Sequence, residues 1–339
     1  TGNKISSESN GGGVYVNGGT FEMNNDASVA DNKAYNSGSC CGGGVYVTGS
    51  KSGFTTNSVT FTMNDNASVT GNIAIGRGTT LDGGGVYVSK GGTFTMNGNS
   101  KVTGNAASDN KNVKGDGGGV YVDTNGNFNM YGDTTSVSGN TATGSGGGVY
   151  VGGVFTVAGK PTVMGNKVGA ADNNVYLDDG KTITIGDHGL SSSENSIGVT
   201  TKDEPTEQAP VTIATGSKTL GDGDAKKFKS DKDGCAVSVD TAKLVLTKIV
   251  VPHTHSWNYE KDGKATIKVT CTNTTGDCAY RNTPATVTIS MTQSTYPYSE
   301  NMDAPTAQLT YSDNWPTDLA KAQESDIKYW KSNDGGNSY

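Results

Sequence analysis

A hexapeptide that returns along the first half of the chain is the feature that most constrains its fold. The five copies of GGGVYV are Gly11–Val16, Gly42–Val47, Gly83–Val88, Gly117–Val122 and Gly146–Val151. A sixth, altered copy reads DNNVYL at Asp172–Leu177. Repeats with a period of a few tens of residues are typical of solenoids, because one unit cannot bury its hydrophobic face alone. The repeat therefore predicts a stacked architecture with a long, regular surface.

Two further motifs lie between successive hexapeptides. One alternates polar and apolar residues, as in Thr60–Met63 and Thr93–Met96, and the other ends in asparagine, as in Val69–Asn72 and Val102–Asn105. Period-two alternation of β-branched and aromatic residues indicates β-strands. Like residues occupy like positions in every unit, which a meander of hairpins would not produce. We therefore predict an all-β fold, a parallel β-helix with three short strands per coil.

Equivalent side chains of stacked coils form rows, because neighbouring strands lie about 4.8 Å apart. The rows expected in the core are Val14, Val45, Val86, Val120, Val149 and Val175; Val16, Val47, Val88, Val122, Val151 and Leu177; Phe21, Phe61, Phe94, Phe128, Phe155 and Ile183; Met23, Met63, Met96, Met130, Val157 and Ile185; and Val29, Val69, Val102, Val137 and Val163. The small residues expected to close the section are Ile5, Ala34, Ala74, Ala107, Ala142 and Val168. The asparagines expected to bridge the turns as an amide ladder are Asn3, Asn32, Asn72, Asn105, Asn140 and Asn166.

The tyrosine of each hexapeptide is expected on the outer face of its strand, between two inward-facing valines. These candidate ligand-binding residues are Tyr15, Tyr46, Tyr87, Tyr121, Tyr150 and Tyr176. Two interpretations stay open at this point. The row can be an aromatic ladder that stabilises the stack, or it can be a stripe that binds a glycan or a protein.

Carboxylates near the triplets raise the possibility of an enzyme. Parallel β-helices host polysaccharide lyases and hydrolases, which gather carboxylates in one groove. Asp82 and Asp116 both precede a GGG triplet and are expected one coil apart, with Arg77 in a nearby loop. The other interpretation is that they are solvated acids of turns, and His188 is isolated. We assign no catalytic residue and expect no cofactor.

The repeat decays after Ile185, and the chain divides into three predicted regions. Residues 1–186 form the β-helix coils, residues 187–252 form irregular last coils and a cap, and residues 253–339 form a second β module. A cap is expected because the last coil of a solenoid otherwise exposes its core. The second module contains all the tryptophans of the chain, which are Trp257, Trp315 and Trp330.

Cysteines and histidines of the second module form a candidate site. His253 and His255, followed by Cys271 and Cys278, are the ligand types of a zinc site. Their spacing differs from that of standard zinc fingers, and the chain has no CxxC pair. We therefore predict a disulfide between Cys271 and Cys278 and keep a metal site and free thiols as the alternatives. The remaining cysteines, for which disulfide and thiol states stay open, are Cys40, Cys41 and Cys235.

Charge and hydropathy exclude some classes of partner. The chain has 339 residues and a net charge of −7, and its arginines are Arg77 and Arg281. A nucleic-acid-binding protein needs a basic face, so no nucleic acid is expected. The sequence lacks an apolar run of about 18 residues, so we expect no membrane insertion of this segment.

The repeats resemble the right-handed parallel β-helix repeats of large surface proteins from Gram-positive gut bacteria, in which GGGVYV–TFTM–SVTGN units recur. They are more loosely similar to repeats of chlamydial polymorphic outer-membrane proteins, which carry GGAI and FxxN. FxxN occurs here at Phe21–Asn24, Phe61–Asn64 and Phe94–Asn97, whereas GGGV replaces GGAI. The first resemblance implies right-handed coils followed by an Ig-like β-sandwich. Residues 253–339 are short for a sandwich of about 100 residues, so the module is expected to be incomplete.

The resemblance also implies an extracellular location, at the cell surface or in the cell wall. We expect a surface-displayed structural or adhesive protein, whose β-helix is a stalk or a platform for a host protein or glycan. One alternative is a carbohydrate-active β-helix enzyme, a lyase or a hydrolase. The other is a subunit of a head-to-tail filament, whose partners are neighbouring copies of itself.

Overall fold

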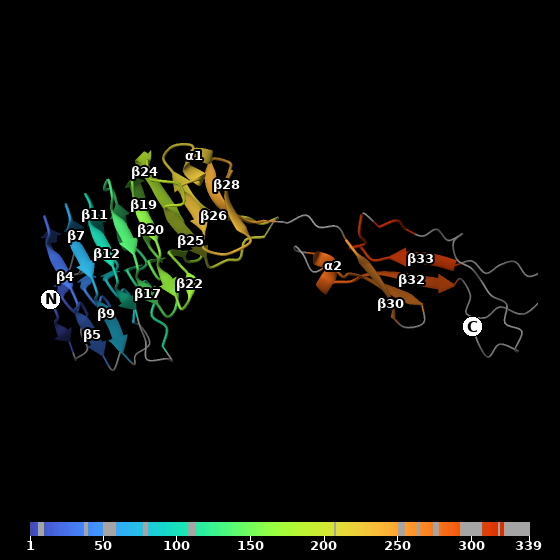
Figure 1. Cartoon of the computed structure of the whole chain (residues 1–339), viewed down its shortest axis with the longest axis horizontal. Coiled ribbons are helices and arrows are strands. Elements are labelled where there is room, and N and C mark those ends of the chain that lie inside the picture. Colours follow the sequence, from blue (N-terminus) through green and yellow to red (C-terminus); the bar gives the residue numbers. More distant parts are fainter. Residues whose placement is uncertain are drawn as a thin grey trace, which may run out of the picture. The chain divides into compact units, whose positions relative to one another are not determined.

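The computed structural model describes most of the chain. The described residues are 1–5, 10–36, 40–49, 59–76, 81–107, 113–206, 208–249, 255–262, 265–273, 278–291, 307–317 and 319–321. Contacts divide the chain into two compact units, Thr1–Ile249 and Val250–Tyr339. Strands dominate both units (Figure 1), and the helices among the described residues are α1 (Asp222–Ala225) and α2 (Ala279–Asn282). Neither helix is long or apolar enough to cross a membrane.

Each repeat of the first unit contributes four strands, and each strand pairs in parallel with its counterpart in the next repeat. One repeat shows the order, which is β6 (Val45–Val47), β7 (Val59–Met63), β8 (Ser68–Thr70) and β9 (Ile73–Gly76). The sequence pattern predicts three strands, with a row of small residues closing the section. That row is a fourth strand because its backbone groups also pair with both neighbouring repeats.

The four parallel stacks are named here after a recurring residue of each (Figure 1). The tyrosine stack comprises β2 (Val14–Val16), β6, β10 (Val86–Val88), β14 (Val120–Val122), β18 (Val149–Val151) and β23 (Val175–Leu177). The phenylalanine stack comprises β3 (Thr20–Met23), β7, β11 (Gly92–Met96), β15 (Asn127–Met130), β19 (Val154–Gly159) and β24 (Ile183–Leu190). The valine stack comprises β4 (Ser28–Ala30), β8, β12 (Lys101–Thr103), β16 (Ser136–Ser138) and β20 (Thr162–Met164). The alanine stack comprises β1 (Lys4–Ile5), β5 (Lys33–Asn36), β9, β13 (Ala106–Ala107), β17 (Thr141–Ala142) and β21 (Lys167–Val168).

The strand register confirms the expected core rows. Phe94 pairs with Phe61 on one side and with Phe128 on the other, and all three side chains are fully buried. The valines that flank each tyrosine pair in the same way. In the first repeat, Phe21 and Val14 are only partly buried, because each has an equivalent neighbour on one side. The rows merge into one continuous hydrophobic core.

Two geometrical needs explain the GGG triplets. The first glycine of each triplet has a φ between 63° and 75°, a region that residues with a Cβ rarely adopt. The second and third glycines lie against the backbone of adjacent strands. A Cβ on Gly84 would lie 2.2 Å from the Ala106 carbonyl carbon and 2.5 Å from the Gly118 oxygen. A side chain here would therefore push the tyrosine stack away from the alanine stack.

The expected amide ladder is present, and its members from Asn32 to Asn174 are buried. The side-chain oxygen of Asn105 accepts the backbone N–H of Asn72 at 2.9 Å, and that of Asn140 accepts the N–H of Asn105 at 2.9 Å. The complete row comprises Asn3, Asn32, Asn72, Asn105, Asn140, Asn166, Asn174 and Asp231. It satisfies backbone donors that the turns would otherwise leave unpaired.

The repeats end where two stacks converge on one strand. Strand β25 (Ile197–Thr201) pairs with the valine stack through Ile197 and with the tyrosine stack through Val199. The phenylalanine stack is extended in parallel by the strand Val211–Gly216. An antiparallel hairpin then pairs with that strand, and its buried Leu244 and Leu246 join the common core. The strands of this region are β22 (Ala171–Asp172), β25, β26 (Val211–Gly216), β27 (Phe228–Ser230), β28 (Cys235–Asp240) and β29 (Lys243–Lys248).

The described part of the second unit contains one antiparallel sheet with the order β30-β31-β32-β33. Its strands are β30 (Trp257–Asp262), β31 (Thr266–Cys271), β32 (Ala285–Met291) and β33 (Ala307–Tyr311). Helix α2 lies between β31 and β32 in the chain. An Ig-like sandwich requires two packed sheets, and the described residues supply one.

Candidate functional site

The six tyrosines of the hexapeptides form one continuous ladder of rings. Adjacent rings are stacked with centroids 4.7–5.4 Å apart and interplanar angles of 8–22°. Parallel pairing in register places each ring above its counterpart, as in Tyr87 between Tyr46 and Tyr121. Stacking covers the ring faces, so the ring edges and hydroxyl groups are what the ladder presents to its surroundings.

The outward orientation expected for these tyrosines does not make them fully exposed. Tyr15 is 51% exposed, whereas Tyr87, in the middle of the ladder, is 9% exposed. Tyr15 has a stacked neighbour on one side only. Stacking therefore buries most of the surface of the inner rings, as expected for a stabilising ladder, and a ligand could contact their edges and the outer face of Tyr15.

Hydroxyl groups of the ladder bond to polar residues of the next repeat. The Tyr87 hydroxyl donates to Asp123 Oδ2 at 3.2 Å, and Tyr150 donates in the same way to Asp178. Asp123 and Asp178 each follow directly after a hexapeptide or its altered copy. Burial raises the pKa of Tyr87 and Tyr150, so these hydroxyl groups are neutral donors at physiological pH.

The acids before the triplets hold backbone rather than line an open groove. Asp82 Oδ1 accepts the backbone N–H of Asp116 at 2.9 Å, and Asp116 Oδ1 accepts the N–H of Ser145. In an earlier repeat, Asn10 Oδ1 accepts the N–H of Cys41 at 3.1 Å. Residues at this position thus bridge successive repeats, whether they are acids or amides.

Burial is the main cause that raises the pKa of Asp82 to about 7; the nearby charges of Asp116 and Asp123 act in the same direction, and the hydrogen bond from the Asp116 N–H acts against them. A carboxyl group that titrates near neutrality is a feature of general acids. A general acid must also reach its substrate, and Asp82 is 3% exposed. Arg77, the other member of the enzyme interpretation, lies outside the described residues.

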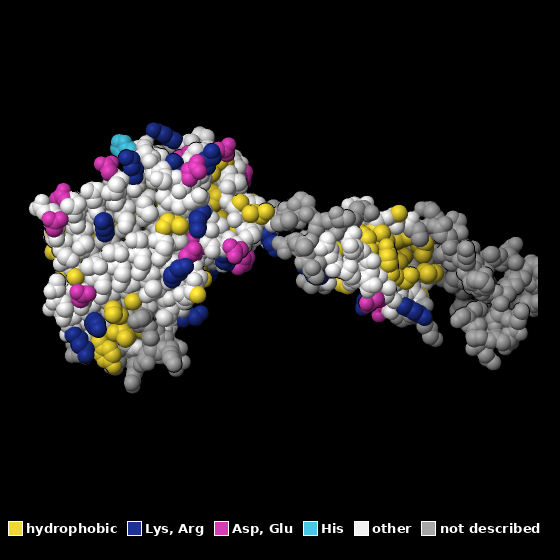
Figure 2. All heavy atoms as spheres, in the orientation of Figure 1, with side chains coloured by type: hydrophobic (Ala, Val, Ile, Leu, Met, Phe, Trp, Pro, Cys, Tyr) yellow, Lys and Arg dark blue, Asp and Glu magenta, His cyan; other side chains and the backbone are white. Residues whose placement is uncertain are grey.

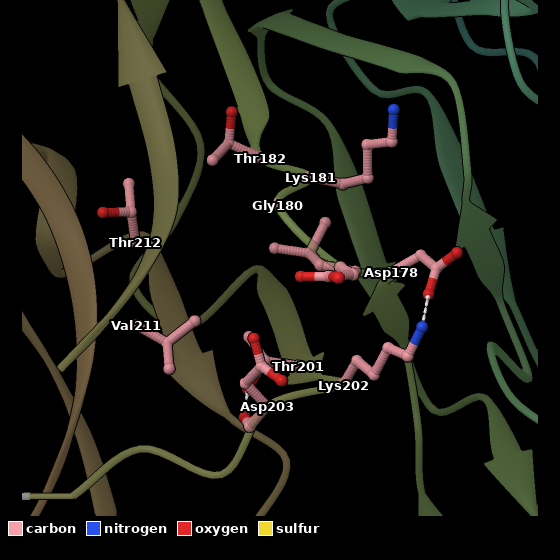
Figure 3. A pocket seen from close by; sticks show the side chains of 11 residues that line it. Asp178, Gly180, Lys181, Thr182, Thr201, Lys202, Asp203, Val211 and Thr212 are labelled. Carbon is pink, nitrogen blue, oxygen red and sulfur yellow. Dashed lines mark hydrogen bonds and ion pairs between the residues drawn. The ribbon is translucent and has the colours of Figure 1, made fainter. Parts of the chain in front are cut away.

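A small hollow lies near the end of the tyrosine stack, between the segment after β23 and the segment after β25 (Figure 3). Its volume is about 190 Å³, below the range of about 300–1,000 Å³ of typical ligand pockets. Figure 3 shows Asp178 and Lys202 meeting at one side, where they form an ion pair at 2.9 Å. The residues that line it include aspartates, lysines and threonines but neither histidine nor cysteine.

The cysteines of the first unit are thiols in the structure. Cys40 is buried, and its Sγ donates to the backbone oxygens of Ala34 and Ile75, each at 3.4 Å. Burial raises the pKa of Cys40 to about 11 and that of Cys41 still higher, which makes both poor nucleophiles. His188, on β24, is exposed, as its isolation in the sequence suggests.

In the second unit, three of the four residues of the sequence-predicted site come together. The side-chain donor atoms of His255, Cys271 and Cys278 all lie within 4.8 Å of one another. The predicted Cys271–Cys278 disulfide is not formed in the structure; instead the two thiols are hydrogen-bonded. His253 lies outside the described residues.

Charged side chains are distributed thinly over the first unit. Figure 2 shows acidic and basic groups scattered singly among uncharged polar side chains on the face drawn, without a basic patch. The described ion pairs of this unit lie on the surface, as for Lys167 with Asp172 at 2.7 Å and Lys202 with Asp178 at 2.9 Å. Such exposed ion pairs contribute little to stability, so the stacked side-chain rows are the main source of stability in this unit.

Comparisons with protein-family models, with curated proteins and with solved structures give no significant match to this chain. The interpretation of its function therefore rests on the residues and their geometry.

Proposed function

We propose that the chain is an extracellular, surface-displayed structural and adhesive protein whose first unit is a right-handed parallel β-helix. In this proposal it resembles the surface proteins of Gram-positive gut bacteria that carry similar repeats. The β-helix is a rigid platform, and the tyrosine ladder is its contact edge for a host protein or glycan. The second unit is an incomplete Ig-like module.

The observation that carries the proposal is the set of uninterrupted ladders. Rings stack from Tyr15 to Tyr176 and from Phe21 to Phe155 without a gap, and the buried amide row accompanies them. Every repeat thus contributes the same contacts to its neighbours. A protein built in this way resists local opening and presents one pattern at regular intervals, which suits spacing and extended recognition.

The position of the acids favours binding over carboxylate catalysis. Asp82 and Asp116 are engaged with the backbone of neighbouring repeats. Asp123 bonds to the Tyr87 hydroxyl. Asp82 is buried, whereas Asp116 and Asp123 are partly exposed. The partly exposed carboxylates and the tyrosine hydroxyl groups can bond to sugar hydroxyls or to peptide amides.

The test is a binding array of glycans and mucin glycoproteins probed with the purified chain. We expect at least one ligand to bind, and binding to fall in Tyr121→Ala/Tyr150→Ala. Tyr121→Phe/Tyr150→Phe keeps the stacked rings and removes only the hydroxyl groups, so it separates edge recognition from stability. The matched control is Thr62→Ala/Thr95→Ala, on adjacent strands of the phenylalanine stack. Depolymerisation of pectin, alginate or chondroitin that disappears in Asp82→Asn would contradict the proposal.

A further inference from the structure

Three metal-ligating side chains converge in the second unit from three separate segments. His255 precedes β30, Cys271 is the last residue of β31, and Cys278 immediately precedes α2. The imidazole nitrogen and the two sulfur atoms lie within 4.8 Å of one another. Atoms bound to one tetrahedral zinc ion, at about 2.0–2.3 Å each, are separated by less than this distance.

Strand pairing explains how residues distant in sequence meet. Strands β30 and β31 are antiparallel, and Trp257 lies opposite Cys271. His255, two residues before Trp257, is therefore carried to the end of β31. The N–H of Thr272 donates to the Ser256 oxygen at 2.7 Å and fixes the chain at this end. The turn that follows Cys278 is closed by the Arg281 N–H, which donates to the Cys278 oxygen at 3.2 Å.

The surroundings of the cluster suit thiolate and imidazole ligands. Cys271 is 3% exposed, and its sulfur accepts backbone hydrogen bonds from Asn273 and Ser256. Such N–H···S bonds stabilise metal-bound thiolates and orient them. The backbone N–H groups thus hold the Cys271 sulfur in place before a metal ion binds.

Aromatic rings enclose the histidine. The centroid of the Trp257 ring lies 4.5 Å from that of His255, and the Tyr280 ring lies 5.7 Å from it, edge-on. Trp257 and Tyr280 also contact each other at 5.4 Å. This packing restricts the rotation of the imidazole and shields one side of the cluster from water, as the shell around structural metal sites does.

We propose that His255, Cys271 and Cys278 form a site for a zinc ion that stabilises the second unit. Two thiolates and one imidazole select zinc over magnesium and calcium, which prefer oxygen ligands. Binding releases the two thiol protons, because the ligands must be deprotonated. The described part of this unit is a single four-stranded sheet, and small β units of this kind commonly depend on a metal or a disulfide.

The first test measures zinc in the full chain. The chain is purified with a non-thiol reductant, which keeps the cysteines reduced without competing for zinc, and is then dialysed. Elemental analysis is expected to find one zinc ion per chain. Cys271→Ser and Cys278→Ser should each abolish zinc binding, and His255→Ala should lower the zinc affinity at least tenfold. Cys235→Ser and His188→Ala are the matched controls and should retain the full zinc content. Zinc that is absent from the unmodified chain, or unaffected by all three site variants, would overturn the proposal.

The second test does not depend on variants that could fail to fold. Cobalt(II) is added to the reduced, metal-free full chain, and its absorption spectrum is recorded. Thiolate-to-cobalt charge transfer together with intense tetrahedral d–d bands, all displaced by zinc, is the expected result. Weak octahedral bands alone would contradict the site. A disulfide without zinc would also contradict the site. In that case the chain purified without reductant would have an intact mass lower by two hydrogen atoms. This mass difference would disappear in Cys278→Ser, and no zinc would bind with or without reductant.

Discussion

At the scale of single residues, one side chain often serves two neighbouring repeats. The Asn105 side-chain nitrogen donates to the Val69 oxygen and to Asn140 Oδ1, both at 3.0 Å, while its oxygen accepts two bonds from Asn72. The residue is 1% exposed, so water cannot replace these partners. The stability of the stack therefore depends on individual polar side chains as well as on apolar packing.

Asn105→Ala should be strongly destabilising. It leaves the buried N–H of Asn72 and the carbonyl of Val69 without a side-chain partner, at a cost of about 1–3 kcal/mol for each unsatisfied group. The free energy of unfolding measured in urea checks this. Asn66→Ala is the matched control, because Asn66 lies in an exposed asparagine row and its loss should cost less than about 0.5 kcal/mol. Equal losses in the two variants would be inconsistent with a buried ladder.

Phe94→Ala should lower the free energy of unfolding by about 3–5 kcal/mol, the usual range for a buried aromatic. Phe94 is fully buried, and its ring stacks on Phe61 at 4.7 Å and on Phe128 at 4.9 Å. Phe21→Ala should cost clearly less, because Phe21 stacks on Phe61 alone and is partly exposed. Chemical denaturation of both variants measures the difference, and the reverse order would refute the packing.

Asp82→Asn should change how stability depends on pH. Because folding raises the pKa of Asp82 from its ordinary value to about 7, the folded chain binds more protons than the unfolded chain between about pH 4 and pH 7. The free energy of unfolding should therefore fall as pH rises through this window. At pH 8 the asparagine variant should be more stable than the unmodified chain by about 1–4 kcal/mol. At pH 4 this advantage in stability should be smaller. Urea unfolding at both pH values is the measurement; parallel pH profiles would show that Asp82 is ionised without penalty.

At the scale of elements, strands keep register while the connections between them vary. The connections from the alanine stack to the tyrosine stack join β5 to β6, β9 to β10 and β13 to β14, so they leave from equivalent positions. The flanking strands pair residue by residue in all three cases. The connection between β6 and β7 is also longer than the one between β10 and β11. Variation in repeat length is thus absorbed in the connections at two corners of the section, while the strands keep their register.

This distinction predicts two different responses to an inserted glycine. Between Ser108 and Asp109, within one of these connections, an insertion should cost less than about 0.6 kcal/mol, as expected from loop-closure entropy. Between Val102 and Thr103 in β12, the same insertion moves following side chains to the opposite face. The cost there should reach about 2–5 kcal/mol, the scale of losing one core side chain. Thermal unfolding of both insertion variants compares them, and similar losses would mean that the strand register is not essential.

At the scale of the whole molecule, the chain consists of two compact units with separate cores. The main core of the first unit runs through the tyrosine, phenylalanine and valine stacks into the terminal hairpin. Ala34 and Ala74 of the alanine stack pack with Cys40 and Leu81 in a separate small cluster. Val269 and Ala285 are fully buried in the sheet of the second unit. The boundary between the two compact units follows Ile249, and each unit is defined by its own internal contacts.

Calorimetry of the full chain should therefore show two separable unfolding transitions. Phe94→Ala should lower the midpoint of one transition only, and Val269→Ala that of the other, because independent units do not share mutational effects. The paired variants serve as controls for each other. A single transition that both substitutions shift would show that the units unfold cooperatively.

The sequence by itself determined the repeat, the side-chain rows and the core. In parallel strands paired in register, equivalent residues lie directly beside one another, so a period in sequence becomes a row in space. Phe94 between Phe61 and Phe128 is the direct result. The asparagine row follows for the same reason, since every repeat carries it at the same turn.

Only the tertiary structure decided features that depend on contacts between segments without a shared pattern. The strand Ala106–Ala107 is too short for its alternation to be recognised in sequence. The burial of Asp82, and hence its raised pKa, depends on which backbone packs against it. The meeting of His255 with Cys271 and Cys278 depends on the antiparallel pairing of β30 with β31, because the register between two strands is a property of the pair and not of either strand alone.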